Sequence, residues 1–353
     1  MIYTFKRSIA EMGFPWRYNR DYLPLGKTSM TREDLWQELS SRIQSCNWHF
    51  FQYHVRKVLG GGRVQLIDSM IEALFVIESA MTGAGRDYIN KIVSFSNKAN
   101  HTPHYDQLLQ VLAEMLVVQH AVSYGWANLK GHVYEPVQTG SAKNPEIVVS
   151  LADLSVGVEV KAPEFVKKHN ERGTKPQQVA TRTDILKLLD KDQTMLPRDN
   201  PVKDFLISAN AKFASFKAAD PNFYGLLVIV WDDFIYEPIS ALVGQPAGLF
   251  TKGSFAHDER GQILKFENVD CVILTRHLLP IRRGTIEEPM PDLSRHPLDY
   301  GRQGEFPFKV YFKNPNSTNE VPEQILRCFQ TIENGQMLGA EYMPQDFIQW
   351  FNS

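Results

Sequence analysis

The residues best suited to do chemistry lie between Pro145 and Ala162. Glu146 stands near one end of this segment, and the triplet Glu159-Val-Lys161 stands thirteen residues later. Carboxylates are hard oxygen ligands that hold Mg²⁺ or Mn²⁺, and a lysine beside them can orient an attacking water or stabilise a charged transition state. Metal-assisted hydrolysis of a phosphodiester needs this combination of groups.

The same segment predicts a hairpin that brings the two ends together. A turn at residues 153–154 leaves apolar side chains alternating along both strands, so that one face of the hairpin is core. On the other face we expect Glu146 to lie opposite Lys161, with Glu159 two residues away. Asp153 would lie at the turn, roughly 20 Å from Glu159 at about 3.3 Å per residue, so we rank it below Glu146 as a ligand.

The pair Pro145-Glu146 followed by Glu159-Val-Lys161 resembles the bipartite signature of the PD-(D/E)xK, or restriction-endonuclease-like, nuclease superfamily. The apolar run over 156–163 is the most typical part of it. The resemblance implies an α/β fold with a central mixed β-sheet flanked by helices. It also implies a Mg²⁺-dependent (or Mn²⁺-dependent) endonuclease in which Glu146, Glu159 and Lys161 are catalytic and the two glutamates are metal ligands. The chain departs from the commonest signature in having Glu rather than Asp after Pro145.

The resemblance implies further site residues by position. In that superfamily a helix before the sheet often supplies another acidic metal ligand, which here would be Glu114. On the helix expected after the lysine, Gln177, Gln178 and Arg182 are candidates for contacts with nucleic acid. Lys175 belongs to the same locally basic stretch, which could hold a phosphate backbone. A solvated helical face explains these residues equally well.

The central residues also have a plain structural explanation. Glu159 and Lys161 could form a cross-strand ion pair at the surface, Pro145-Glu146 could simply begin a strand, and Glu114 could meet only a lysine or solvent. However, Glu159-Val-Lys161 is the only acidic-x-lysine triplet in the chain, and it falls on a predicted strand with a matching partner. This coincidence favours the functional interpretation.

Composition limits the remaining classes of protein. The 353 residues, 43% of them hydrophobic, can bury a sizeable core, and a formal charge of −2 gives no bulk attraction for nucleic acid or anionic membranes. Three widely spaced cysteines argue against a disulfide framework or a zinc ribbon. We expect a cytoplasmic protein without membrane contact, because the start of the chain does not resemble a signal peptide and no run is apolar enough to span a bilayer.

Hydrophobic periodicity predicts a helical first hundred residues, followed by a mixed α/β region. The predicted helices cover residues 31–57, 64–81, 103–124, 176–191, 201–217, 322–332 and 344–351. The predicted strands cover residues 132–138, 146–151, 156–162, 225–231 and 269–275.

Three regions follow from this order of elements. Residues 1–100 form a helical region for recognition or partner binding, 101–282 a nuclease-like core, and 283–353 a C-terminal extension with short helices. We expect a nuclease that acts on DNA rather than RNA, with restriction, phage defence or repair as roles by analogy. The alternatives are a catalytically silent module that binds nucleic acid or a protein partner, and an unrelated α/β enzyme. A protein partner or a homo-oligomer is compatible with all three of these functions.

Overall fold

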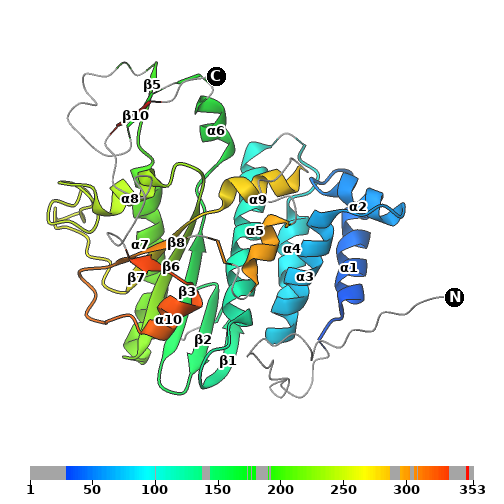
Figure 1. The fold of residues 1–353 in the computed structure, drawn as a ribbon, viewed down its shortest axis with the longest axis horizontal. Coiled ribbons are helices and arrows are strands. Elements are labelled where there is room, and N and C mark those ends of the chain that lie inside the picture. Colours follow the sequence, from blue (N-terminus) through cyan, green and yellow to red (C-terminus); the bar gives the residue numbers. More distant parts are fainter. Residues whose placement is uncertain are drawn as a thin grey trace.

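The chain folds around a central β-sheet covered by helices on both faces (Figure 1). The computed structural model describes residues 29–99, 101–136, 144–172, 174–175, 177–179, 190, 192–286, 295–302, 306–307, 309–333 and 347–349. In these ranges the structure is of the α/β class with a mixed sheet, as the sequence predicts.

The central sheet has seven strands in the described part of the chain, in the order β1-β2-β3-β6-β7-β8-β9. Their bounds are β1 Leu129–Tyr134, β2 Ile147–Leu151, β3 Ser155–Lys161, β6 Phe223–Trp231, β7 Cys271–Arg276, β8 Lys309–Lys313 and β9 Ile332–Glu333. Strands β3, β6 and β7 run parallel, whereas β1, β2 and β3 form an antiparallel meander. The hairpin with the candidate chemistry is therefore joined directly to the parallel centre of the sheet.

The described part of the N-terminal region, residues 29–99, is helical, as predicted. Its helices are α1 Arg32–Ser45, α2 Gln52–Leu59, α3 Gln65–Ala80 and α4 Ala84–Ser94, and α5 Thr102–Ser123 follows them. Thr31 caps α1 in a capping box with Asp34. The prediction of one helix over 31–57 is wrong, because the chain turns between α1 and α2, where Asn97 accepts hydrogen bonds from the backbone N–H groups of Asn47 and Trp48.

Helix α5 covers one face of the sheet, and α7 (Asp199–Ala219) covers the other. The α5 face includes Val149 and Val158, which share one core cluster with the N-terminal helices. The α7 face includes Val148 and Leu227, which belong to a second cluster. In Figure 1 helices α1 to α4 lie beyond α5, on the side away from the sheet. Because alternate residues of a strand point to opposite faces, Glu159 shares the α7 face with Val148.

Shorter elements complete the fold. They are α6 Val166–Arg172, α8 Tyr236–Val243, α9 Leu278–Thr285, the 3₁₀ helix η3 Pro297–Gly301, α10 Glu323–Cys328, and a small sheet of β4 Gln177–Val179, β5 Thr194–Met195 and β10 Phe347–Gln349. Among the described residues, no helix has the length and apolar character needed to cross a membrane.

Two predicted helices are wrong where the structure describes them. Residues 177–179 and 347–349 were expected to be helical, but β4 and β10 pair with each other as antiparallel strands. The strand β8 was not predicted, although it pairs with β7 and extends the central sheet. Pairing with a distant segment overrides local preference in each case.

Candidate active site

The hairpin forms as predicted, but its register differs by two residues. Ile147 pairs with Val158 rather than with Val160, and Leu151 N–H donates to the carbonyl of Leu154 (2.8 Å), so the turn lies at residues 152–153 rather than at 153–154. Because the shift is even, each side chain keeps its face of the sheet. Continuing this register places Glu146 opposite Glu159, so the prediction that it lies opposite Lys161 is wrong.

Glu159 is a fully buried carboxylate held between two lysines. Its side chain is 0% exposed. Lys161 Nζ lies 2.7 Å from Oε1 of Glu159. Lys212 Nζ, reaching in from α7, lies 2.7 Å from Oε1 and 2.8 Å from Oε2. A buried charge is tolerated when it is paired in this way.

Glu146 is also buried, but it is less completely neutralised. Its Oε1 lies 3.4 Å from Lys212 Nζ, and its Oε2 lies 3.8 Å from Lys91 Nζ. Burial raises the pKa of Glu146 to about 7, and repulsion from Glu114 and Glu159 adds to the rise, while the two lysines oppose it. This carboxyl therefore changes its protonation near neutral pH.

Glu114 enters the cluster from α5, through Lys91 of α4. Lys91 Nζ lies 3.2 Å from Glu114 Oε2 and 2.8 Å from Glu135 Oε1. Burial raises the pKa of Glu114, and Lys91 counteracts this. Burial alone would lower the pKa of Lys91, but the nearby acids, Glu114 first among them, raise it above its usual value.

Together these groups form a chain of alternating charges, which we call the ionic chain. Its members, in order of contact, are Glu114, Lys91, Glu146, Lys212, Glu159 and Lys161. Four of the six were predicted as site residues from the sequence. The structure thus brings three helices, α4, α5 and α7, together with the β2–β3 hairpin.

Sequence reasoning missed Lys91 and Lys212, although one signal for Lys212 was present. It stands within the buried stripe of α7, beside Ala209, Phe213 and Phe216. A lysine on the apolar face of a helix needs a buried acidic partner or a route to solvent. The position of Lys212 on that apolar stripe could therefore have identified it as a candidate site residue.

The residues proposed for nucleic-acid contact lie elsewhere. Gln178 is buried in β4 and donates a hydrogen bond to Glu237, and the side chain of Gln177 accepts one from Thr194 (3.3 Å). Lys175 is half-buried in the loop after α6, and Arg182 lies outside the described residues. These hydrogen bonds hold both glutamines to residues outside the ionic chain.

Two carboxylates of the ionic chain can share one cation, because the ammonium of Lys212 contacts both. The ammonium of Lys212 lies 3.4 Å from Glu146 and 2.7 Å from Glu159, so both carboxylates already face one positive charge. In the described residues, no three histidine, cysteine, aspartate or glutamate side chains converge as a ready metal site. The lysines stand between the carboxylates instead, so a metal would be held by Glu146 and Glu159, with Glu114 farther out.

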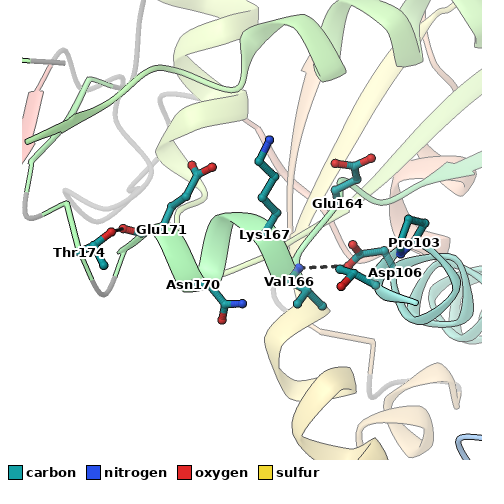
Figure 2. A pocket seen from close by; sticks show the side chains of 9 residues that line it. Pro103, Asp106, Glu164, Val166, Lys167, Asn170, Glu171 and Thr174 are labelled. Atoms are coloured by element: carbon teal, nitrogen blue, oxygen red, sulfur yellow. Dashed lines mark hydrogen bonds between the residues drawn. The ribbon is translucent and has the colours of Figure 1, made fainter. Parts of the chain in front are cut away.

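A hollow of about 600 Å³ opens just beyond the carboxyl end of β3, between the start of α5 and α6 (Figure 2). Asp106 lies on its wall and accepts hydrogen bonds from the backbone N–H groups of Phe165 (3.0 Å) and Val166 (3.1 Å), which fixes the start of α6. Its other charged lining residues are Glu164, Lys167 and Glu171. Three acids against one lysine do not suit a phosphate backbone, so we do not assign this hollow to the substrate.

Searches of family models, curated proteins and solved structures find no match for this chain. Function must therefore be inferred from the geometry of the ionic chain and from the resemblance of its residues to the PD-(D/E)xK signature.

Proposed function

We propose that the protein is a divalent-metal-dependent nuclease of the PD-(D/E)xK type, acting on DNA rather than RNA. One observation carries the proposal: a single ammonium bridges Glu146 and Glu159, and Lys161 contacts the second of these carboxylates at 2.7 Å. A site that accommodates one cation between two buried carboxylates, with a lysine alongside, has the parts that phosphodiester hydrolysis requires.

Each residue has a distinct role in this proposal. Glu146 and Glu159 would hold Mg²⁺ or Mn²⁺, and the bound metal would supply a water of lowered pKa and positive charge for the phosphoryl oxygens. Lys161, whose side chain is 16% exposed and 2.7 Å from Glu159, would orient the attacking water or stabilise the developing negative charge. Glu114 contacts Lys91 rather than either ligand, so we assign it to the outer part of the site.

The order of elements supports a restriction-endonuclease-like core. Helix α5 precedes the β1–β2–β3 meander, and α7 leads into the parallel strand β6. The acid and lysine triplet thus lies on the strand that joins the meander to the parallel part of the sheet. The preference for DNA follows from the resemblance alone.

A second candidate function is a silent module that binds nucleic acid or a protein through the same fold. One observation favours it: the three carboxylates Glu114, Glu146 and Glu159 are matched by three lysines. Each of these buried carboxylates therefore has a lysine as a counter-charge without a metal. Such a module would bind its partner equally well in the presence of EDTA.

The test is cleavage of supercoiled, linear and single-stranded DNA, and of RNA, with Mg²⁺, Mn²⁺ or EDTA. We expect metal-dependent cutting of DNA that falls about 100-fold or more in Glu159→Gln and in Lys161→Met. Lys130→Met, on the exposed edge strand β1, is the control and should cut as the wild type does. Nucleic-acid binding without cutting would favour the silent module, and cutting that survives both site variants would refute the assignment.

A further inference from the structure

We propose that Lys212 is a built-in counter-cation of the candidate metal site. In the metal-free protein it neutralises Glu146 and Glu159, and it gives up these contacts when a divalent cation binds. The inference rests on the proposed function and adds to it a mechanism that controls metal occupancy.

The contacts of Lys212 identify it as the group that a metal must displace. Its ammonium lies 2.7 and 2.8 Å from the two oxygens of Glu159 and 3.4 Å from Oε1 of Glu146. In the described part of the chain, its hydrogen bonds and ion pairs are all with these two proposed ligands. Two like charges cannot share this space, so the lysine and a metal ion exclude each other.

The other lysines of the ionic chain have different attachments. Lys91 pairs with Glu114 and Glu135, and its ammonium lies 5.2 Å and 5.4 Å from the ring centroids of Tyr88 and Tyr134. These contacts hold Lys91 whether or not Glu146 binds a cation. Among the residues that the structure describes, the ion pair of Lys161 is with Glu159 alone, and it does not bridge the two carboxylates.

Lys212 also has the means to withdraw. Its side chain is 17% exposed, whereas Glu159 beneath it is fully buried, so the ammonium has a route toward solvent. A lysine is a point charge on a flexible four-carbon stem, and it can change rotamer without movement of the helix. The two carboxylates stay buried when Lys212 withdraws, so they then need another positive charge in its place.

Removal of this positive charge should therefore tighten metal binding. While Lys212 occupies the site, a metal cannot bind there. The apparent affinity for the metal is therefore the intrinsic affinity multiplied by the fraction of molecules in which the site is free. We expect Lys212→Met to bind Mn²⁺ and Mg²⁺ about tenfold or more tightly than the wild type. Lys212→Arg keeps the charge and should not tighten binding.

The measurement is titration calorimetry of the full chain with MnCl₂ and MgCl₂, together with thermal unfolding with and without the metal. Lys217→Met is the matched control. Lys217 lies on the same helix, has a 15% exposed side chain and pairs with buried Asp270 at 2.6 Å, outside the ionic chain. Both Met variants should unfold at lower temperature without metal, but only Lys212→Met should recover on addition of Mn²⁺.

The outcomes separate this inference from the proposed function. If the wild type binds Mn²⁺ and Lys212→Met binds no more tightly, the counter-cation role is wrong and the metal site stands. If neither protein binds Mn²⁺ or Mg²⁺, the proposed metal-dependent function is wrong, and the inference fails with it. Should Lys212→Met not fold, Lys212→Gln, which keeps a donor for Glu159, is held to the same expectation.

Discussion

Two buried clusters of charged side chains meet helix α7, and they are built from different cations. The ionic chain uses the lysines Lys91, Lys161 and Lys212. The second group, which we call the arginine cluster, consists of Arg172, Arg198, Asp232 and Glu237 and lies at the start of α7. Both clusters contain buried carboxylates, so burial alone does not distinguish a structural cluster from a candidate site.

The arginine cluster is fixed in several directions at once. Arg198 donates to both oxygens of Asp232 (3.0 and 2.9 Å) and through Nε to Glu237 (2.7 Å), and it lies over the ring of Trp231. Burial alone would raise the pKa of Asp232, but Arg198 and Arg172 hold it below its usual value. Forked hydrogen bonds and stacking fix this arginine by direction as well as by charge.

The ionic chain is under-compensated by comparison. Its Glu146 has a pKa raised to about 7, and its lysines approach that carboxylate no closer than 3.4 Å. Lysine contributes a point charge that can be exchanged, whereas arginine contributes a rigid fork. The choice of cation therefore distinguishes a cluster that fixes the fold from one in which, as we propose, a metal would replace a lysine.

The largest effect should come from breaking the arginine cluster. Arg198→Met leaves Asp232 and Glu237 buried with too little positive charge, and should lower the free energy of unfolding by about 3–5 kcal/mol. Added Mg²⁺ should not restore it. Urea unfolding measures the loss, with Arg276→Met as control, because its ion pair with Asp233 is partly exposed and should contribute about 1 kcal/mol or less. Equal losses in the two variants would contradict a special role for the cluster.

An intermediate effect is expected from Glu146→Gln, and it should depend on pH. The folded pKa of about 7 lies above the ordinary value of 4.5, so the folded state favours the protonated carboxyl. The stability that Glu146 contributes is present below about pH 4.5 and is lost as the pH rises through 7.

Unfolding in EDTA at pH 5, 7 and 9 tests this expectation. Relative to the wild type, Glu146→Gln should gain about 1–3 kcal/mol between pH 5 and pH 9, with little further gain above pH 8. The control is Glu33→Gln, on the exposed side of α1, which should follow the wild type at each pH. A Gln variant that parallels the wild type throughout would show that Glu146 is fully compensated, as Asp232 is.

Much of the fold was predictable because its central elements are long and apolar. The strands β6 and β7 are mostly apolar, and the bounds of α5 and α7 differ from the predicted ones by only one or two residues. Strands of this kind are buried on both faces, so local sequence and final environment agree.

The register of the hairpin was not predictable from the apolar pattern. Since side chains alternate with period 2, a shift by two residues keeps every valine on its face, and both registers satisfy the pattern. The turn decided between them, through the hydrogen bond from Leu151 to Leu154. Glu146, Glu159 and Lys161 could therefore be placed on one face, but not paired.

Contacts between elements far apart in the chain could not be predicted from the sequence, for a different reason. Lys212 meets Glu159 because α7 packs across β3, and no local pattern specifies that crossing. Likewise β4 is a strand because residues 347–349 pair with it. Local propensity is weak for such a short segment, so the tertiary partner decides.

The smallest effect should come from Arg172→Lys, which keeps the charge and changes only the shape of the cation. Arg172 lies 3.3 Å over the ring centroid of Phe234, and a lysine would lose that stacking, at a cost of about 0.5–1.5 kcal/mol. The control is Lys168→Arg on the same helix, which should change stability by less than about 0.5 kcal/mol. If Arg172→Lys is as silent as the control, the shape of arginine does not fix its cluster. The arginine cluster and the ionic chain would then differ only in the distance between each cation and its carboxylate.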